Sequence, residues 1–192
     1  MSRLAPARVR AGGRSERVRR RVADACLALL ADGEVDFGPV EVARRSGVSR
    51  ATIYRWWPAK ADLLREALTR HTRSLAAPET GSWEGDVREF AATLAAFFSD
   101  PVEVSQNALM ATGAHPDYTA AVLEHYASIF DDWRAMLARA RDRGEVAAGI
   151  DADAVLLTLV SPLVVVPLLF RRRLSPDEIG AVVDLVLRGS VP

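Results

Sequence analysis

The 192-residue sequence has a single cysteine, Cys26, and few aromatic residues, which make up 7% of the chain. One cysteine cannot form an internal disulfide or supply a cysteine-based zinc site, so nothing requires an oxidising compartment. The three histidines, His71, His115 and His125, also lack the spacing of metal ligands. We therefore expect no bound metal, no other cofactor and a cytoplasmic protein.

The sequence also lacks an apolar run of the roughly 20 residues that a transmembrane helix needs. The most apolar run, 155–170, has 16 residues and contains Pro162 and Pro167. The arginines near the N-terminus have no continuous apolar stretch behind them, so we expect no signal peptide. These features predict no membrane partner, and they make 155–170 a buried core or interface helix.

Catalytic signatures and strand patterns are missing as well. The sequence shows no nucleophile–base arrangement, phosphate-binding loop or carboxylate pair, so we predict no catalytic residues and no enzyme activity. Ala, Leu, Val and Arg dominate the composition, which favours helix. No segment alternates between polar and apolar residues as a half-buried strand does. The predicted fold class is therefore all-α.

The formal charge is zero in total but is divided unevenly along the chain. Residues 1–73 carry 16 Lys/Arg and 8 Asp/Glu, whereas residues 74–192 carry 9 and 17, so the two parts have charges of +8 and −8. A basic part of this kind indicates a polyanionic partner. We interpret residues 1–14 as a basic flexible arm that neutralises phosphates or enters a minor groove. A solvated arm without a partner is the alternative.

Apolar residues at three- and four-residue spacing predict helices along most of the chain. Several helix ends carry a marker, such as Pro39 at a first position and Gly33 after a last one. The segment 76–82 contains Pro and Gly and is the predicted boundary between two domains, 15–75 and 83–192. The predicted helices are 15–32, 39–45, 49–57, 59–75, 83–99, 101–112, 116–143, 151–172 and 176–188.

The segment 39–57, PVEVARRSGVSRATIYRWW, has the spacing of a DNA-binding helix-turn-helix. A small residue, Ala43, would lie where two helices approach closely, and Gly47, four residues on, suits the positive φ of a tight turn. Ser49 is a suitable N-cap for the second helix. An ordinary helical hairpin is the alternative, but the segment lies in the basic part of the chain. The side chains expected to fill the space between the two helices are those of Val42, Val48, Ile53 and Trp56.

From residue 20 to residue 68 the sequence resembles the DNA-binding domain of the TetR family of bacterial transcriptional regulators. The residues that carry the resemblance are 41–64, EVARRSGVSRATIYRWWPAKADLL. The family commonly has His-Phe or Tyr-Phe where this chain has Trp56 and Trp57, so the aromatic character of the pair is retained. A less specific resemblance to one type of TetR C-terminal domain involves residues 143–151, Pro162 and residues 183–189.

The resemblance implies that residues 15–75 form a helix-turn-helix domain whose third helix enters the major groove of a double-stranded DNA operator. Arg50 would then bond a guanine edge, and Ala51 and Thr52 would contact a thymine methyl group. Tyr54 and Arg55 would meet phosphates, or a base in the case of Arg55. An exposed Tyr54 packed on the Lys60 side chain is the alternative. The predicted DNA-contacting residues are Arg50, Ala51, Thr52, Tyr54, Arg55, Trp56 and Lys60.

The resemblance also implies that residues 83–192 provide a ligand cavity and a dimer interface. Large, adaptable side chains suit a small apolar effector, and a few polar ones would orient it. Each candidate could instead be a surface or core residue. The candidate ligand-binding residues are Phe97, Asn107, Met110, His125, Tyr126, Phe130 and Trp133.

The helices 151–172 and 176–188 are the most apolar of the chain and suit a four-helix interface across the two-fold axis of a homodimer. Ordinary buried core helices are the alternative. The candidate interface residues are Leu159, Leu163, Val166, Phe170, Val182, Val183 and Val186.

These expectations combine into one predicted function. The protein would be a homodimeric repressor that binds a palindromic operator and is released by a small apolar molecule. An activator, or a DNA-binding regulator controlled by a protein partner, is the alternative within the same class. A helical enzyme fused to a DNA-binding domain is a third hypothesis, which no catalytic constellation supports.

Overall fold

The computed structural model describes residues 13–190, and these residues contain helices but no strands. The predicted helices are present, with ends that differ from the prediction by a few residues at most, and the all-α fold class is confirmed. The predicted arm, residues 1–14, lies outside the described residues except for its last two, and Arg14 already belongs to the first helix. The α-helices are α1 (Arg14–Ala31), α2 (Pro39–Ser46), α3 (Arg50–Trp56), α4 (Lys60–His71), α5 (Trp83–Phe98), α6 (Pro101–Thr112), α7 (Pro116–Asp142), α8 (Ala152–Phe170) and α9 (Pro176–Ser190).

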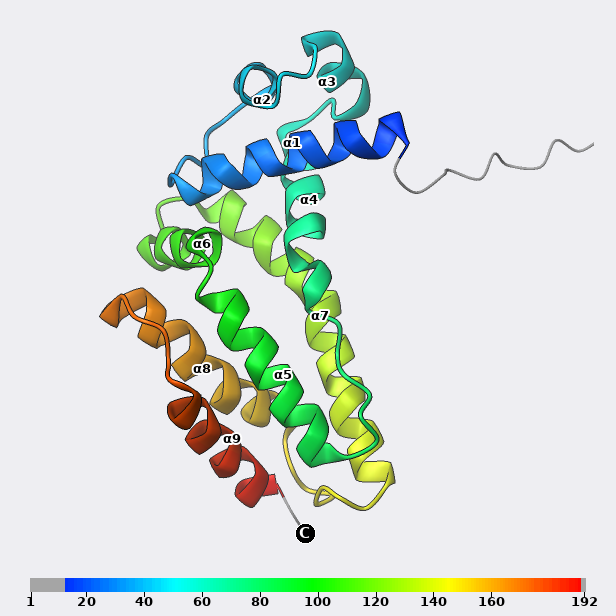
Figure 1. The fold of residues 1–192 in the computed structure, drawn as a ribbon, viewed down its shortest axis with the longest axis vertical. Helices are drawn as coiled ribbons and strands as arrows, with labels where there is room; N and C mark the ends of the chain where they lie inside the picture. Colours follow the sequence, from blue (N-terminus) through cyan, green and yellow to red (C-terminus); the bar gives the residue numbers. More distant parts are fainter. Residues whose placement is uncertain (1–12, 191–192) are drawn as a thin grey trace, which may run out of the picture.

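The first four helices form the upper part of the molecule in Figure 1, with α2 and α3 at its end. The turn between α2 and α3 depends on Gly47, whose φ of 63° is favourable for glycine and costly for other residues. Ser49 caps α3 as predicted, because its side chain accepts a hydrogen bond from the backbone NH of Thr52. The Arg21 guanidinium of α1 donates to the Ser46 carbonyl from Nε, at 2.9 Å, and from Nη2, at 2.6 Å. This contact ties α1 to the end of α2.

Of the two adjacent tryptophans, Trp57 is the one buried in the core of this part, whereas Trp56, which was expected to fill it, packs only against its edge. Trp57 is buried, and its Nε1 donates to Glu66 of α4 at 3.1 Å, whereas Trp56 is only partly buried. The two tryptophans differ in burial because α3 ends at Trp56. Trp57 takes a non-helical conformation, with φ −134° and ψ 76°, and its ring lies against α4.

The remaining helices form the lower part of the molecule, in which α5 packs against α8 and α9, and the long α7 lies alongside α4 and α5 (Figure 1). The segment after α4 forms a single 3-10 turn, Thr72–Ser74, and residues 75–82 are not helical. That segment includes the predicted boundary at 76–82.

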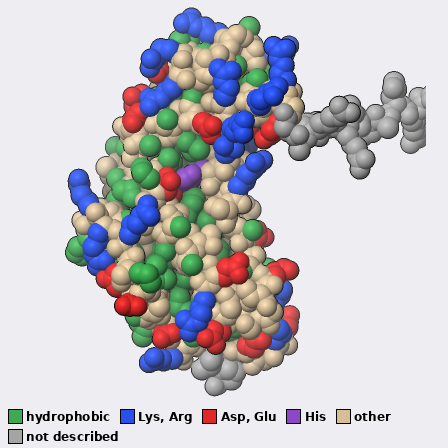
Figure 2. Space-filling model, viewed as in Figure 1, with side chains coloured by type: hydrophobic (Ala, Val, Ile, Leu, Met, Phe, Trp, Pro, Cys, Tyr) green, Lys and Arg blue, Asp and Glu red, His purple; other side chains and the backbone are tan. Residues whose placement is uncertain are grey.

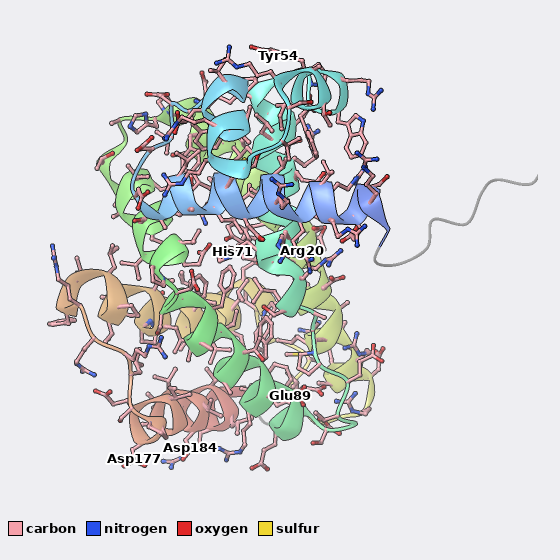
Figure 3. All side chains as sticks on the ribbon, turned by 45° about the horizontal axis from the view of Figure 1, so that its top comes forward. Arg20, Tyr54, His71, Glu89, Asp177 and Asp184 are labelled. Carbon is pink, nitrogen blue, oxygen red and sulfur yellow. The ribbon has the colours of Figure 1, made fainter. Side chains whose placement is uncertain are left out.

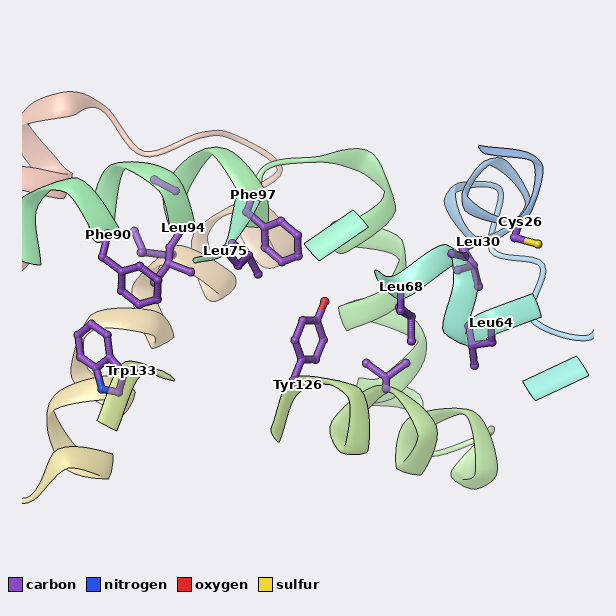
Figure 4. Close-up of a cluster of buried hydrophobic side chains, with 14 of the residues drawn as sticks. Cys26, Leu30, Leu64, Leu68, Leu75, Phe90, Leu94, Phe97, Tyr126 and Trp133 are labelled. Carbon is purple, nitrogen blue, oxygen red and sulfur yellow. The ribbon is translucent and has the colours of Figure 1, made fainter. Parts of the chain in front are cut away.

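The two parts share one continuous core of buried apolar side chains. Figure 4 shows part of it, from Cys26 and Leu30 at one end to Phe90 and Trp133 at the other. Contacts of α1 with α6 and of α4 with α7 cross between the parts. At the end of α1, the Ser105 hydroxyl of α6 donates to the Ala31 carbonyl at 2.8 Å, which satisfies a helix-terminal acceptor.

Candidate nucleic-acid interface and internal cavity

The helix α3 presents one face to solvent and packs the other into the core. Ile53 is fully buried, while Arg50, Ala51, Tyr54 and Arg55 are exposed, with half of the Tyr54 surface accessible. Neither Arg50 nor Arg55 has an acidic partner in the part of the chain that the structure describes. Their guanidinium groups are therefore available to phosphates or base edges, which are the acceptors that arginine pairs with bidentately.

A groove of about 730 Å³ lies between the first turns of α1 and the helix α3. Arg14 and Arg17 line it from α1, and Thr52, Arg55 and Trp56 line it from α3. The sequence placed Arg14 in the predicted basic arm and Arg17 in the first predicted helix, and the position of both beside α3 was not predicted. Their spacing was the available signal, because residues three apart on a helix share a face. Figure 2 shows Lys and Arg side chains gathered over this end of the molecule.

Lys60 begins α4, and its ammonium group is paired within the protein. It lies 3.2 Å from Asp36 and 6.0 Å from the centre of the Phe37 ring, in the loop between α1 and α2. Both charged groups of this pair are largely exposed, so the pair adds little stability and a phosphate could replace Asp36. Arg44 and Arg45 of α2 are exposed, and they pair with Glu41 and Asp32.

The lower part contains a partly open cavity of about 160 Å³ between α5, α6, α7 and α8. Its lining is mostly apolar, and its polar side chains are Glu103, Asn107 and Tyr126. Five of the seven candidate ligand-binding residues line it: Asn107, Met110, Tyr126, Phe130 and Trp133.

Two candidates lie elsewhere. The cavity is lined by Phe98 rather than Phe97, because successive residues of a helix point about 100° apart. The Phe97 ring lies 4.8 Å from the His71 ring of α4, measured between centroids. His125 faces a groove between α4 and α7, where its Nε2 is hydrogen-bonded to the Thr72 hydroxyl at 2.9 Å, and burial lowers its pKa.

A buried polar cluster adjoins the cavity, and sequence reasoning missed its central residue, Glu103, which is 1% exposed. Glu103 Oε1 accepts hydrogen bonds from Gln106 Nε2 at 2.6 Å and from the Tyr126 hydroxyl at 2.8 Å. The same oxygen lies 3.0 Å from His71 Nε2. The Tyr118 hydroxyl donates to Gln106 Oε1 at 2.9 Å. A Glu three residues before a Gln, and so on the same face of the helix, was the available signal.

The tyrosines of this cluster are held in their protonated form. The pKa of Tyr126 is raised by burial, then by the charge of Glu103 and the hydrogen bond to it, and burial is also the main cause of the raised pKa of Tyr118. Both hydroxyls therefore act as donors. Within residues 13–190, no group of three or more His, Cys, Asp or Glu residues is arranged to hold a metal ion.

The helices α8 and α9 expose apolar side chains, but most of these are not the interface residues predicted from the sequence. Leu159, Leu163, Val183 and Val186 are buried in the protomer's own core, and Val166 and Val182 are half-buried. Phe170 is exposed as the interface prediction requires, at 66%. The other large apolar side chains exposed on these helices are Leu157, Val165, Leu169 and Leu185.

The helix α8 is apolar on all sides, which explains the error, because hydrophobicity alone does not tell its inner face from its outer one. It is long and apolar enough to span a membrane by length and composition, yet Leu159 and Leu163 on its inner face pack in the protein core. We call the exposed set Leu157, Val165, Leu169 and Leu185 the outer face. Phe170 comes seven residues after Leu163, so it lies on the same side of α8 as Leu163 and is exposed at the end of the helix.

A basic helix-turn-helix joined through one core to a helical part with its own cavity defines a DNA-binding regulator of transcription. Residues 33–67 match the family model described as bacterial regulatory proteins, tetR family, and residues 77–186 match that of the tetracyclin repressor-like C-terminal domain. The chain is 33% identical to the HTH-type transcriptional regulator AqdR of Rhodococcus erythropolis over 78% of this chain and 74% of that protein. The protein belongs to the TetR family of bacterial transcriptional regulators, and it is a DNA-binding regulator rather than an enzyme.

Other relatives and solved structures agree with this assignment. The chain is 28% identical to the regulator YdeS of Bacillus subtilis over 91% of this chain and 88% of that protein. The crystal structure of the TetR family regulator SCO0332 matches with a TM-score of 0.70 and 26% identity, over 92% of this chain and all of that one. The regulator TylP of Streptomyces fradiae matches with a TM-score of 0.75 and 20% identity, over 94% and 89% of the two chains, and so supports the fold.

Proposed function

We propose that this regulator is a cytoplasmic homodimeric repressor that binds a palindromic operator and is released when a small, mainly apolar effector fills the cavity between α5, α6, α7 and α8. The observation that carries the proposal is the exposed basic face of α3 beside the arginines of α1. The repressor role is supported by a relative, the HTH-type transcriptional repressor LfrR of Mycolicibacterium smegmatis, which is 41% identical over 63 residues, or 33% of this chain.

The proposed DNA contacts follow from the exposed side chains. An α-helix fits the major groove, so α3 would bring Arg50 to a guanine edge while Ala51 and Thr52 meet a thymine methyl group. Arg14 and Arg17, across the groove from α3, would bind the phosphates that flank the contacted bases. Tyr54, Arg55, Trp56 and Lys60 would contact the phosphate backbone of the DNA. Arg55 would also reach a base.

The homodimer is supported by the outer face of α8 and α9. Leu157 and Leu185 are 68% and 67% exposed, and an apolar patch of this kind on a soluble chain marks an interaction surface. Two copies would pack these helices as a four-helix arrangement around a two-fold axis. The operator half-sites would then lie about one DNA turn, or a multiple of it, apart.

The response to effector is supported by the position of α4. This helix begins at Lys60, directly after α3, and ends at His71 beside the cavity cluster. Figure 3 shows His71 in the middle of the molecule and Tyr54 at its end. A shift of α4 would change the spacing of the two α3 helices in the dimer, and both must match the DNA grooves together.

Selection of duplexes from a randomised pool by the purified protein tests DNA recognition. We expect enrichment of a palindrome, confirmed by a footprint that covers both half-sites. Failure to enrich any sequence would contradict the proposal. Transcript levels in a deletion strain then test the direction of control, because genes next to the selected operator should rise if the protein represses them and fall if it activates them.

A further inference from the structure

Glu103 is a buried carboxylate for which the structure supplies only a weak set of counter-groups. No Lys or Arg forms an ion pair with it among residues 13–190. The Gln106 amide and the Tyr126 hydroxyl donate hydrogen bonds to it, and the buried His71 Nε2 lies 3.0 Å away without a hydrogen bond. A charge buried away from water is unfavourable unless it is paired and hydrogen-bonded. The Glu103 carboxylate is therefore a strong local acceptor within an otherwise apolar region.

The cavity beside Glu103 restricts the shape of a ligand. Its volume of about 160 Å³ is close to that of a protein cavity that accepts a single benzene ring. Phe90, Phe130 and Trp133 are among the side chains around it, and its polar side chains are limited to Glu103, Asn107 and Tyr126. The Asn107 amide nitrogen already donates to the Glu103 backbone carbonyl at 2.8 Å, and the Tyr126 hydroxyl donates to the Glu103 side chain. The polar part of the cavity therefore favours a donor over an acceptor.

We propose that the cavity selects a small aromatic amine in its protonated form, whose ring lies among the apolar side chains and whose ammonium group binds the Glu103 carboxylate. The ammonium group would take the place of His71 Nε2 beside that carboxylate. This inference rests on the effector role proposed above for the same cavity, and it adds the chemical class of the effector.

The contact with His71 gives the amine a route to the DNA-binding part. His71 is the last residue of α4. Its Nε2 lies 3.0 Å from Glu103 Oε1, and its ring centroid lies 4.8 Å from that of Phe97. Loss of the Glu103 contact would free the end of the helix whose other end follows α3. By linkage, the amine and the operator then weaken each other's binding by the same factor.

The first test uses the full-length protein without DNA and three ligands of similar size. Phenethylamine carries the ammonium group, propylbenzene replaces it with a methyl group, and phenylacetate has a carboxylate in place of the whole terminal aminomethyl group. We expect calorimetry to show phenethylamine binding at least about tenfold more tightly than propylbenzene, with phenylacetate the weakest. Equal affinities, a preference for phenylacetate, or no binding of phenethylamine would overturn the proposal.

Variants then assign the preference to one carboxylate. Glu103→Gln should lose at least about tenfold in affinity for phenethylamine and change the affinity for propylbenzene less than about threefold. Glu89→Gln makes the same substitution on the exposed surface of α5 and should change neither affinity. A folded Glu103→Gln protein that keeps the full amine preference would overturn the assignment, and the ligand series on the unmodified protein decides the ligand class if this variant does not fold.

The last test measures the route through α4 with the operator obtained by selection. Phenethylamine should lower the operator affinity of the unmodified protein by roughly 5–150-fold, the usual range of allosteric coupling. His71→Phe keeps a ring against Phe97 but cannot pair with Glu103, so it should bind the operator and lose this response. A full response in His71→Phe would overturn the route. Because the ligand series needs no DNA, an amine preference without operator binding would contradict only the repressor function.

Discussion

The two parts of this regulator place polar and apolar side chains in opposite ways. Around α3, apolar residues such as Ile53 are buried and the basic residues lie outside. In the helices after α4, Glu103 and Asp86 are buried, while Leu157 and Phe170 are exposed. Around α3, a single chain therefore buries its own apolar residues and leaves its basic side chains exposed for DNA. The second part leaves an acceptor inside and an apolar surface outside, so we infer that a ligand and a second protomer complete it.

The largest effect is expected where the inner face of α8 meets the core. Leu163→Ala removes a fully buried side chain and should lower the free energy of unfolding by about 2–5 kcal/mol. Denaturant unfolding followed by circular dichroism measures this loss. Val40→Ala, at a more exposed position of α2, is the control and should change stability by less than about 0.5 kcal/mol. Similar losses in both variants would contradict the inner position of Leu163.

A second prediction concerns the outer face of the same helix. Leu157→Glu should leave the protomer helical, because the side chain is largely exposed, and should weaken the dimer at least about 100-fold by burying an unpaired charge at the interface. Sedimentation measures the dissociation constant, and Ala127→Glu on the exposed surface of α7 is the matched control. An unchanged dimer in Leu157→Glu would remove the outer face from the interface.

The third prediction separates the two kinds of DNA contact in the basic part. Arg50→Ala should cost about 1–3 kcal/mol of operator affinity and relax the preference at one base pair. Arg17→Ala should weaken binding to all sequences alike and reduce the dependence of log affinity on log salt by about 1. Salt titrations with the selected operator and with a scrambled duplex distinguish them. Loss of a single base preference in Arg17→Ala would reverse the two roles.

The smallest effect is expected at the start of α9, where Glu178 accepts from the Ser175 backbone NH and from both terminal nitrogens of Arg172. The hydrogen bonds from Arg172 are the main cause that lowers the pKa of Glu178 from 4.5 to about 2. A lowered folded-state pKa means that the carboxylate contributes its stability above pH 4.5 and loses it as the pH falls towards 2. Thermal unfolding between pH 5 and about pH 2.5 should therefore decline less in Glu178→Gln than in the unmodified protein, and equal declines would contradict this.

The helices and the family could be predicted from the sequence because their signals are local. The Ser49 cap, the Gly47 turn and the prolines at helix starts each act within a few residues, and the structure keeps them. The position of Trp57 depends on how the chain leaves α3, and the cluster of Glu103 and His71 depends on two helices that meet only in the folded protein. Those features required the structure.

The sequence also does not determine which side of a strongly apolar helix faces the core, as the outer face of α8 and the pair Phe97 and Phe98 show. Where nearly every residue of a helix is apolar, as in α8, composition does not indicate which side faces the core. Two adjacent phenylalanines differ by one step of helix rotation, and only the packing of α5 decides that Phe98 lines the cavity.

The hydrogen bond from Ser105 to Ala31 restricts which chimeras between members of the family can fold. The helix α1 ends against α6 with a carbonyl that needs a donor, and the DNA-binding helices share a continuous apolar core with the helices that follow. A chimera that joins residues 13–75 to the second part of another regulator must therefore supply a hydroxyl or an equivalent donor at this position, and a matching apolar surface under α1 and α4. Transplanting the sequence specificity of this protein thus requires the contact residues of α6 and α7 as well as the DNA-binding helices.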